Sequence, residues 1–104
     1  MLKKKEETME VRIQDIHFDA SQQLVDFINT KADHMSRRYP TLDYTEFTLT
    51  LIKPQTIKNK EARVKAIVPH HGEFTATKTA DSFEAAITEA LEAVEAQLAK
   101  IKDK

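Results

Sequence analysis

The sequence has no cysteine and only one glycine among its 104 residues. Without cysteine the chain cannot form a disulfide or a thiolate metal site, and a reducing compartment is allowed. The single glycine, Gly72, excludes the glycine-rich loop that cradles phosphates in many nucleotide-binding proteins. No apolar run approaches the roughly 20 residues that a transmembrane helix needs.

The chain also lacks an excess of either positive or negative charge. The 16 basic and 17 acidic side chains leave a formal net charge of −1, so no global field draws the protein to nucleic acid. Any such binding must use a local basic patch. Hydrophobic residues make up 40% and charged residues 32% of the chain, which favours a globular protein over a disordered one. The length predicts one domain that folds without disulfides or metals.

The first residues are polar. Three lysines, Lys3 to Lys5, are followed by two glutamates and not by an apolar segment, so we do not interpret this start as a secretory signal. We expect residues 1–8 to be a disordered N-terminal lead-in and residues 9–104 to form the domain. The expected location is the cytoplasm.

Hydrophobic periodicity predicts four strands and two helices in the order β-α-β-β-β-α. Apolar and polar residues alternate, as in half-buried strands, over residues 9–14, 44–53, 61–68 and 73–78. Apolar residues at spacings of three and four predict helices over residues 19–39 and 81–104. We expect Asp19 and Asp81 to cap these helices, because Gln22 and Glu84 follow three residues later.

These elements predict an α+β fold: a two-layer βαβββα sandwich in which a four-stranded sheet carries two helices on one face. Short loops join the last three strands, which favours an antiparallel meander, and the helical crossover makes the first strand parallel to its neighbour. We expect Gly72 to provide positive φ in a tight connection after His70 and His71. Three basic side chains would lie on the open sheet face: Arg12, Arg63 and Lys65.

Signals for catalysis are weak. The sequence has no nucleophile elbow, phosphate loop or zinc-type spacing. We interpret His70 and His71 as exposed turn histidines rather than metal ligands. His17 and His34 have no carboxylate or nucleophile partner at a fixed spacing. We therefore expect no enzymatic activity, no cofactor, no metal and no small-molecule substrate.

Basic side chains mark both predicted helices. Lys31 falls inside the apolar stripe of the first helix, so its stem must lie along the core with the ammonium group at the rim. Arg37 and Arg38 end that helix beside Tyr39, which suits the helix dipole and also contact with phosphates and bases. The second helix ends in Lys100, Lys102 and Lys104. If the helices pack side by side, these clusters form one divided basic surface.

Four segments carry a resemblance to a known family. They are MEVRIQDIHFDAS from Met9, the L-x-x-F-I-x-x-K pattern of Leu24–Lys31, and the segments Asp81–Ile87 and Gln97–Lys104. Together and in this order they resemble the short form of the ribosome hibernation-promoting factors, the family that includes the ribosome-associated inhibitor of translation. The resemblance implies a βαβββα fold, similar in architecture to double-stranded-RNA-binding domains.

The resemblance also implies a function without catalysis. Family members bind ribosomal RNA of the small subunit in the messenger and transfer RNA channel, inhibit translation and favour inactive ribosome dimers under stress or in stationary phase. Residues 9–104 would be the ribosome-binding domain. The implied partners are the small subunit with its RNA and a separate ribosome dimerisation factor, without a membrane. The implied RNA-binding residues are Lys31, Arg37, Arg38, Lys78, Lys100, Lys102 and Lys104, of which Lys78 is the weakest match.

The second helix departs from the family pattern. Ala93 and Ala96 stand among Glu89, Glu92 and Glu95, where family members often carry lysine or arginine. Fewer cations predict weaker or differently placed phosphate contacts, so we expect RNA on the first helix and the extreme C-terminus. Acidic residues early in a helix and basic residues at its end also fit stabilisation through the helix dipole alone. A generic double-stranded-RNA-binding module and a protein-interaction module without an RNA role remain as alternatives.

Overall fold

The computed structural model of the chain describes residues 10–52 and 57–102. Its elements are β1 (Glu10–Ile16), α2 (Gln22–Arg38), β2 (Tyr44–Leu51), β3 (Lys60–Val68), β4 (Gly72–Ala80) and α3 (Phe83–Lys102). The predicted βαβββα order is confirmed, with β1 and β4 longer than expected. The predicted lead-in at residues 1–8 lies outside the described residues.

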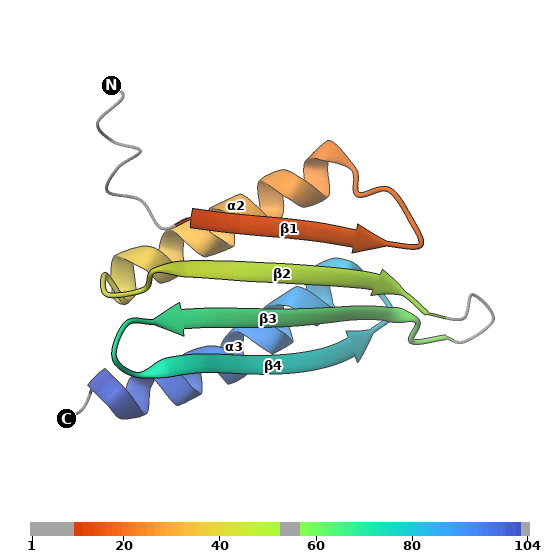
Figure 1. The fold of residues 1–104 in the computed structure, drawn as a ribbon. Coiled ribbons are helices and arrows are strands. Elements are labelled where there is room, and N and C mark those ends of the chain that lie inside the picture. Colours follow the sequence, from red (N-terminus) through yellow and green to blue (C-terminus); the bar gives the residue numbers. More distant parts are fainter. Residues whose placement is uncertain (1–9, 53–56, 103–104) are drawn as a thin grey trace, which may run out of the picture.

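The strands form one mixed sheet in the order β1-β2-β3-β4. β1 is parallel to β2, whereas β2, β3 and β4 form an antiparallel meander, as predicted. Both helices cover the same face of the sheet, with α2 behind β1 and α3 across β3 and β4 (Figure 1). The α+β two-layer sandwich is therefore confirmed. Neither helix of the described chain is long and apolar enough to cross a membrane.

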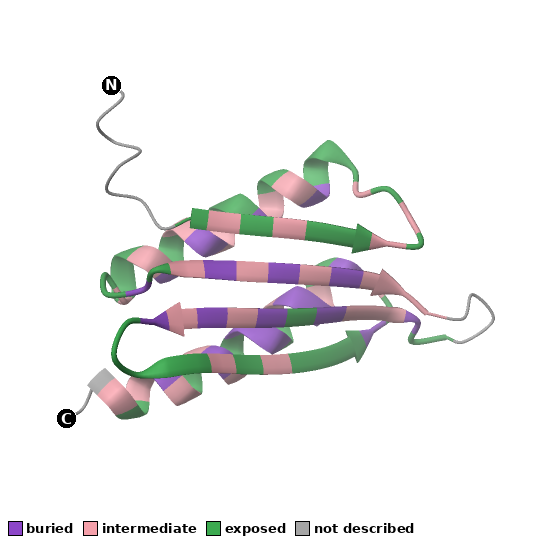
Figure 2. Ribbon diagram, in the orientation of Figure 1, coloured by how far each residue is buried: buried purple, intermediate pink, exposed green. Residues whose placement is uncertain are grey.

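Burial alternates along the two central strands (Figure 2). The inward positions of β3 are all buried: Ala62, Val64, Ala66 and Val68. From β2, Phe47 and Leu49 are fully buried on the same side. This period of two leaves one sheet face for the helices and the other for solvent.

Charged side chains cross the open face in one row, in which Arg12 faces Glu46 and Glu46 faces Lys65. Lys65 Nζ lies 3.5 Å from Glu46 Oε1. The Arg12 guanidinium stacks 4.2 Å from the centre of the Tyr44 ring. A hydrogen bond to the Glu10 carboxylate raises the pKa of Arg12 above its ordinary value, so this side chain stays charged. The face therefore carries both signs of charge.

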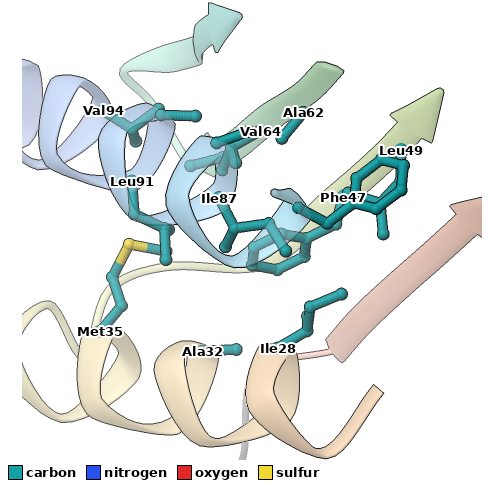
Figure 3. Packing of buried hydrophobic residues seen from close by; sticks show 14 of the residues in the cluster. Ile28, Ala32, Met35, Phe47, Leu49, Ala62, Val64, Ile87, Leu91 and Val94 are labelled. Carbon is teal, nitrogen blue, oxygen red and sulfur yellow. The ribbon is translucent and has the colours of Figure 1, made fainter. Parts of the chain in front are cut away.

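The core fills the space between the two layers. Ile28 of α2 and Ile87 of α3 have no exposed surface, and Met35 of α2 points toward Leu91 of α3 (Figure 3). Alanines on α3 face the sheet, including Ala90, which is also fully buried. Small side chains bring the helix backbone close to the strands. The packed core fixes which sides of α2 and α3 point outward.

Serines rather than aspartates begin both helices. Ser21 Oγ accepts a hydrogen bond from the backbone N–H three residues on at 3.1 Å, and Ser82 Oγ does the same at 3.1 Å. The predicted caps at Asp19 and Asp81 were wrong. A capping side chain must directly precede the first helical residue to reach these N–H groups, and the two aspartates lie one or two positions too early.

Candidate nucleic-acid interface

The two helices leave a hollow between them, the interhelical hollow, of about 240 Å³. Its lining residues are Lys31, His34, Arg38, Thr88, Leu91, Glu92 and Glu95. Lys31 is half-buried, and its Nζ lies 5.3 Å from the centre of the Phe27 ring one turn earlier. The apolar stem therefore packs along the helix while the ammonium group reaches the rim, as predicted.

Acids of α3 balance the charge of this hollow. Arg38 Nη1 donates to Glu95 Oε1 at 3.0 Å, and Glu92 also lines the hollow. Two cations and two carboxylates therefore face each other, together with His34. Acids of α3 therefore interrupt the basic surface between the helices. The reason is helical geometry: with Leu91 in the core, Glu92 and Glu95 fall on the flank that faces α2.

Arg37 points away from this hollow. Its Nη2 lies 2.9 Å from Asp33 Oδ2 one turn earlier, and its side chain is 73% exposed. Exposed ion pairs of this kind contribute about 0–1 kcal/mol, so a phosphate competes readily for the guanidinium. The two arginines that end α2 thus both have carboxylate neighbours but remain near solvent.

The predicted lysines are spread over two regions. Lys100 is exposed and lines a hollow of about 570 Å³ with His71, Phe74, Gln97 and Ile101. Lys102 is the last residue of α3, and its side chain, like the whole of Lys104, lies outside the described part. Lys78 is exposed on the edge strand β4, opposite Ala62 and hence on the helix side of the sheet. It lies near the other end of β4 from Lys100.

Three segments meet at one end of the molecule (Figure 1). Between them lies another hollow, the terminal hollow. It has a volume of about 500 Å³. Its walls are residues 38–41 at the end of α2, residues 68–71 between β3 and β4, and Leu98 and Ile101 of α3. Sequence reasoning did not predict this hollow, because no motif marks it and its walls come from three separate segments.

The connection between β3 and β4 is a tight turn with an unusual residue in it. His71 N–H donates to the Val68 carbonyl at 3.0 Å, Pro69 occupies the second position, and His70 occupies the third with φ of 72°. This is the arrangement of a type II turn, which normally places glycine at the third position. The positive φ expected at Gly72 is confirmed at 100°, but that at His70 was missed.

One further side chain was missed although the sequence signals it. His34 follows Lys31 by three residues and precedes Arg38 by four, so all three share one face of α2. The histidines do not build a metal centre: over residues 10–52 and 57–102, no group of three or more histidine, aspartate or glutamate side chains could hold a metal ion.

Residues 11–104 match the model of the family described as Sigma 54 modulation protein / S30EA ribosomal protein. The chain belongs to this family. The resemblance recognised from the sequence motifs is thereby confirmed. No curated protein matches the sequence.

Two solved structures share the fold of this S30EA family member. A ribosomal subunit interface protein from Coxiella burnetii is 18% identical, with a TM-score of 0.76 over 92% of this chain and 100% of that chain. The N-terminal domain of Protein Y from Thermus thermophilus is also 18% identical, with a TM-score of 0.73 over 89% of this chain and 99% of that chain. At this identity the likeness establishes the fold.

Proposed function

We propose that this protein is a ribosome hibernation factor. It binds ribosomal RNA of the small subunit in the messenger and transfer RNA channel, inhibits translation without catalysis, and favours inactive ribosome dimers under stress or in stationary phase. The match of residues 11–104 to the S30EA ribosomal protein family carries the proposal. The two similar structures, a ribosomal subunit interface protein and a Protein Y domain, agree with it.

The helix layer is the side that meets RNA in this proposal. Lys31, Arg37 and Arg38 lie on the outward parts of α2, and Lys100 lies at the end of α3. The open sheet face fits RNA less well, because its cations alternate with Glu46 and other acids. Lys102 and Lys104 would extend the cationic end of α3. A separate ribosome dimerisation factor is a second partner, and ribosome binding places the protein in the cytoplasm.

Co-sedimentation of the purified protein with purified small subunits tests the proposal. We expect association that weakens steeply as salt rises, because cations on the protein replace counterions on RNA phosphates. Transfer RNA should displace the protein, since both would occupy the same channel. Absence of association at low salt would contradict the proposal.

Two controls separate the alternatives. A generic double-stranded-RNA-binding module reads shape over about 16 base pairs, so a simple duplex of that length should then bind as tightly as the small subunit. For a protein-interaction module without an RNA role, combined replacement of Lys31, Arg37 and Arg38 by glutamate should leave the partners unchanged. We expect instead that the duplex binds more weakly and that the triple variant loses the small subunit.

A further inference from the structure

The terminal hollow has the shape and lining of a small-molecule site. Its volume of about 500 Å³ lies within the range of about 300–1,000 Å³ that such sites occupy. Val68, Leu98 and Ile101 supply an apolar surface, and five ring-bearing residues stand around it: Tyr39, Pro40, Pro69, His70 and His71. A flat, ring-shaped ligand is the natural complement to such walls.

The polar side chains at the rim restrict the ligand further. Arg38, His70 and His71 line the hollow, and none of the described residues that line it is an acid. Lys100 lines the adjoining hollow, which shares His71 and Ile101 with this one. Arg38 also donates to the Glu95 carboxylate, so a phosphate of the ligand would compete with that carboxylate. The rim therefore favours a ligand that combines a flat apolar part with negative charge.

We propose that the terminal hollow binds a single unpaired RNA nucleotide, with the base between Tyr39 and the β3–β4 turn and the flanking phosphates near Arg38 and Lys100. Aromatic and histidine rings stack on unpaired bases, and arginine pairs with phosphate. The inference rests on the proposed function and deepens it. The protein would read a bulged or looped nucleotide in its target RNA as well as the backbone of a helix.

His70 gives this inference a second line of support. It holds the third position of the type II turn with φ of 72°, where glycine would be free of steric strain. Residues held in sparsely populated backbone conformations cluster at functional sites. The imidazole beside the hollow supplies a reason for histidine here, and it allows a substitution that removes the ring while favouring the turn.

The probe is an RNA hairpin with a stem of about 16 base pairs and one bulged 2-aminopurine. The matched RNA has the same stem with the 2-aminopurine paired. We expect binding to quench the fluorescence of the bulged base. We also expect the bulged RNA to bind about tenfold more tightly than the paired RNA, because the bulged base can stack in the hollow. Equal affinity and equal fluorescence for the two RNAs would overturn the inference.

Three variants test whether the preference for the bulged RNA arises in the terminal hollow. Thr41→Trp fills the hollow from an exposed wall position, and His70→Gly removes the imidazole while retaining the turn. Both should lose the preference for the bulged RNA, and urea unfolding should find His70→Gly no less stable than the parent. Thr79→Trp adds the same ring on the open sheet face and should keep the preference. Loss of preference in Thr79→Trp, or its retention in the other two, would overturn the inference.

Co-sedimentation with small subunits, measured in parallel, shows whether only the nucleotide site is wrong or the proposed function is wrong as well. If the parent protein binds small subunits but shows no preference for the bulge, the hollow does not bind a nucleotide and the proposed function stands. If the parent protein neither binds small subunits nor prefers the bulged RNA, the proposed function and the inference both fail. If Thr41→Trp instead converts a self-associated protein to a monomer in analytical ultracentrifugation, the occupant is a second copy of the chain and the inference is wrong.

Discussion

Arg38 at the end of α2 donates from Nη1 to the Glu95 carboxylate of α3 at 3.0 Å, so an acid of one helix engages a predicted RNA-binding cation of the other. The arginine side chain is 64% exposed and the glutamate 24%. An RNA phosphate that approaches Arg38 must therefore compete with a carboxylate that the core packing of α3 holds in place. This ion pair therefore limits the affinity of the protein for RNA.

Removing that carboxylate should strengthen binding. We expect Glu95→Gln to bind small subunits up to about fivefold more tightly, since an exposed ion pair contributes about 0.2–1 kcal/mol. Fluorescence anisotropy of the labelled protein at fixed salt measures the effect. Glu73→Gln removes the same charge from the opposite, open sheet face and serves as the control. An equal gain in both variants would assign the effect to net charge alone.

Lys31 should contribute one phosphate contact. We expect Lys31→Gln to weaken small-subunit binding and to reduce the slope of log affinity against log salt by about one. Arg63→Gln is the matched control, because it also removes one positive charge but lies exposed on the open sheet face. If the control lowers the slope as much as Lys31→Gln, RNA meets the sheet face and not the helices.

The start of α3 should depend on Ser82. Loss of its hydroxyl in Ser82→Ala leaves a helix N–H without its partner and should lower the free energy of unfolding by about 1 kcal/mol. Asp81→Ala should cost less, because this carboxylate does not cap the helix. Urea unfolding of both variants measures the difference. The reverse order of the two costs would mean that the aspartate is the cap.

Ile87 should be among the most costly core positions to truncate. Its side chain has no exposed surface between α3 and the sheet, so Ile87→Ala should lower the free energy of unfolding by about 2–5 kcal/mol. Ile57→Ala makes the same truncation at a position that is 84% exposed and should stay within about 0.5 kcal/mol of the parent. Similar costs at the two positions would contradict the packing described for the core.

Much of the fold could be predicted because its signals are local. Val64 and Ala66 stand at alternate positions of β3 and share the inward face, which a period of two predicts directly. The apolar stripe around Ile28 has the helical period. The helix caps could not be fixed in this way. Asp19 and Ser21 both have capping side chains, and only the backbone path of the preceding loop decides between them.

The candidate site was less predictable, since it depends on contacts between distant segments. Helical spacing places Lys31 and Arg38 on one face of α2, but it carries no information on which residues of α3 lie opposite. The pairing of Arg38 with Glu95 joins residues 57 positions apart. The positive φ of His70 was missed for a different reason: glycine is the usual residue for that geometry, and Gly72 lies two residues later.

A cryo-electron microscopy map of the protein on purified small subunits would show directly which face meets RNA. We predict density for the protein in the messenger and transfer RNA channel, with α2 and the C-terminal end of α3 against ribosomal RNA phosphates and the sheet face turned away. Density at another site, or contact through the open face around Arg12 and Lys65, would contradict the proposed mode of binding.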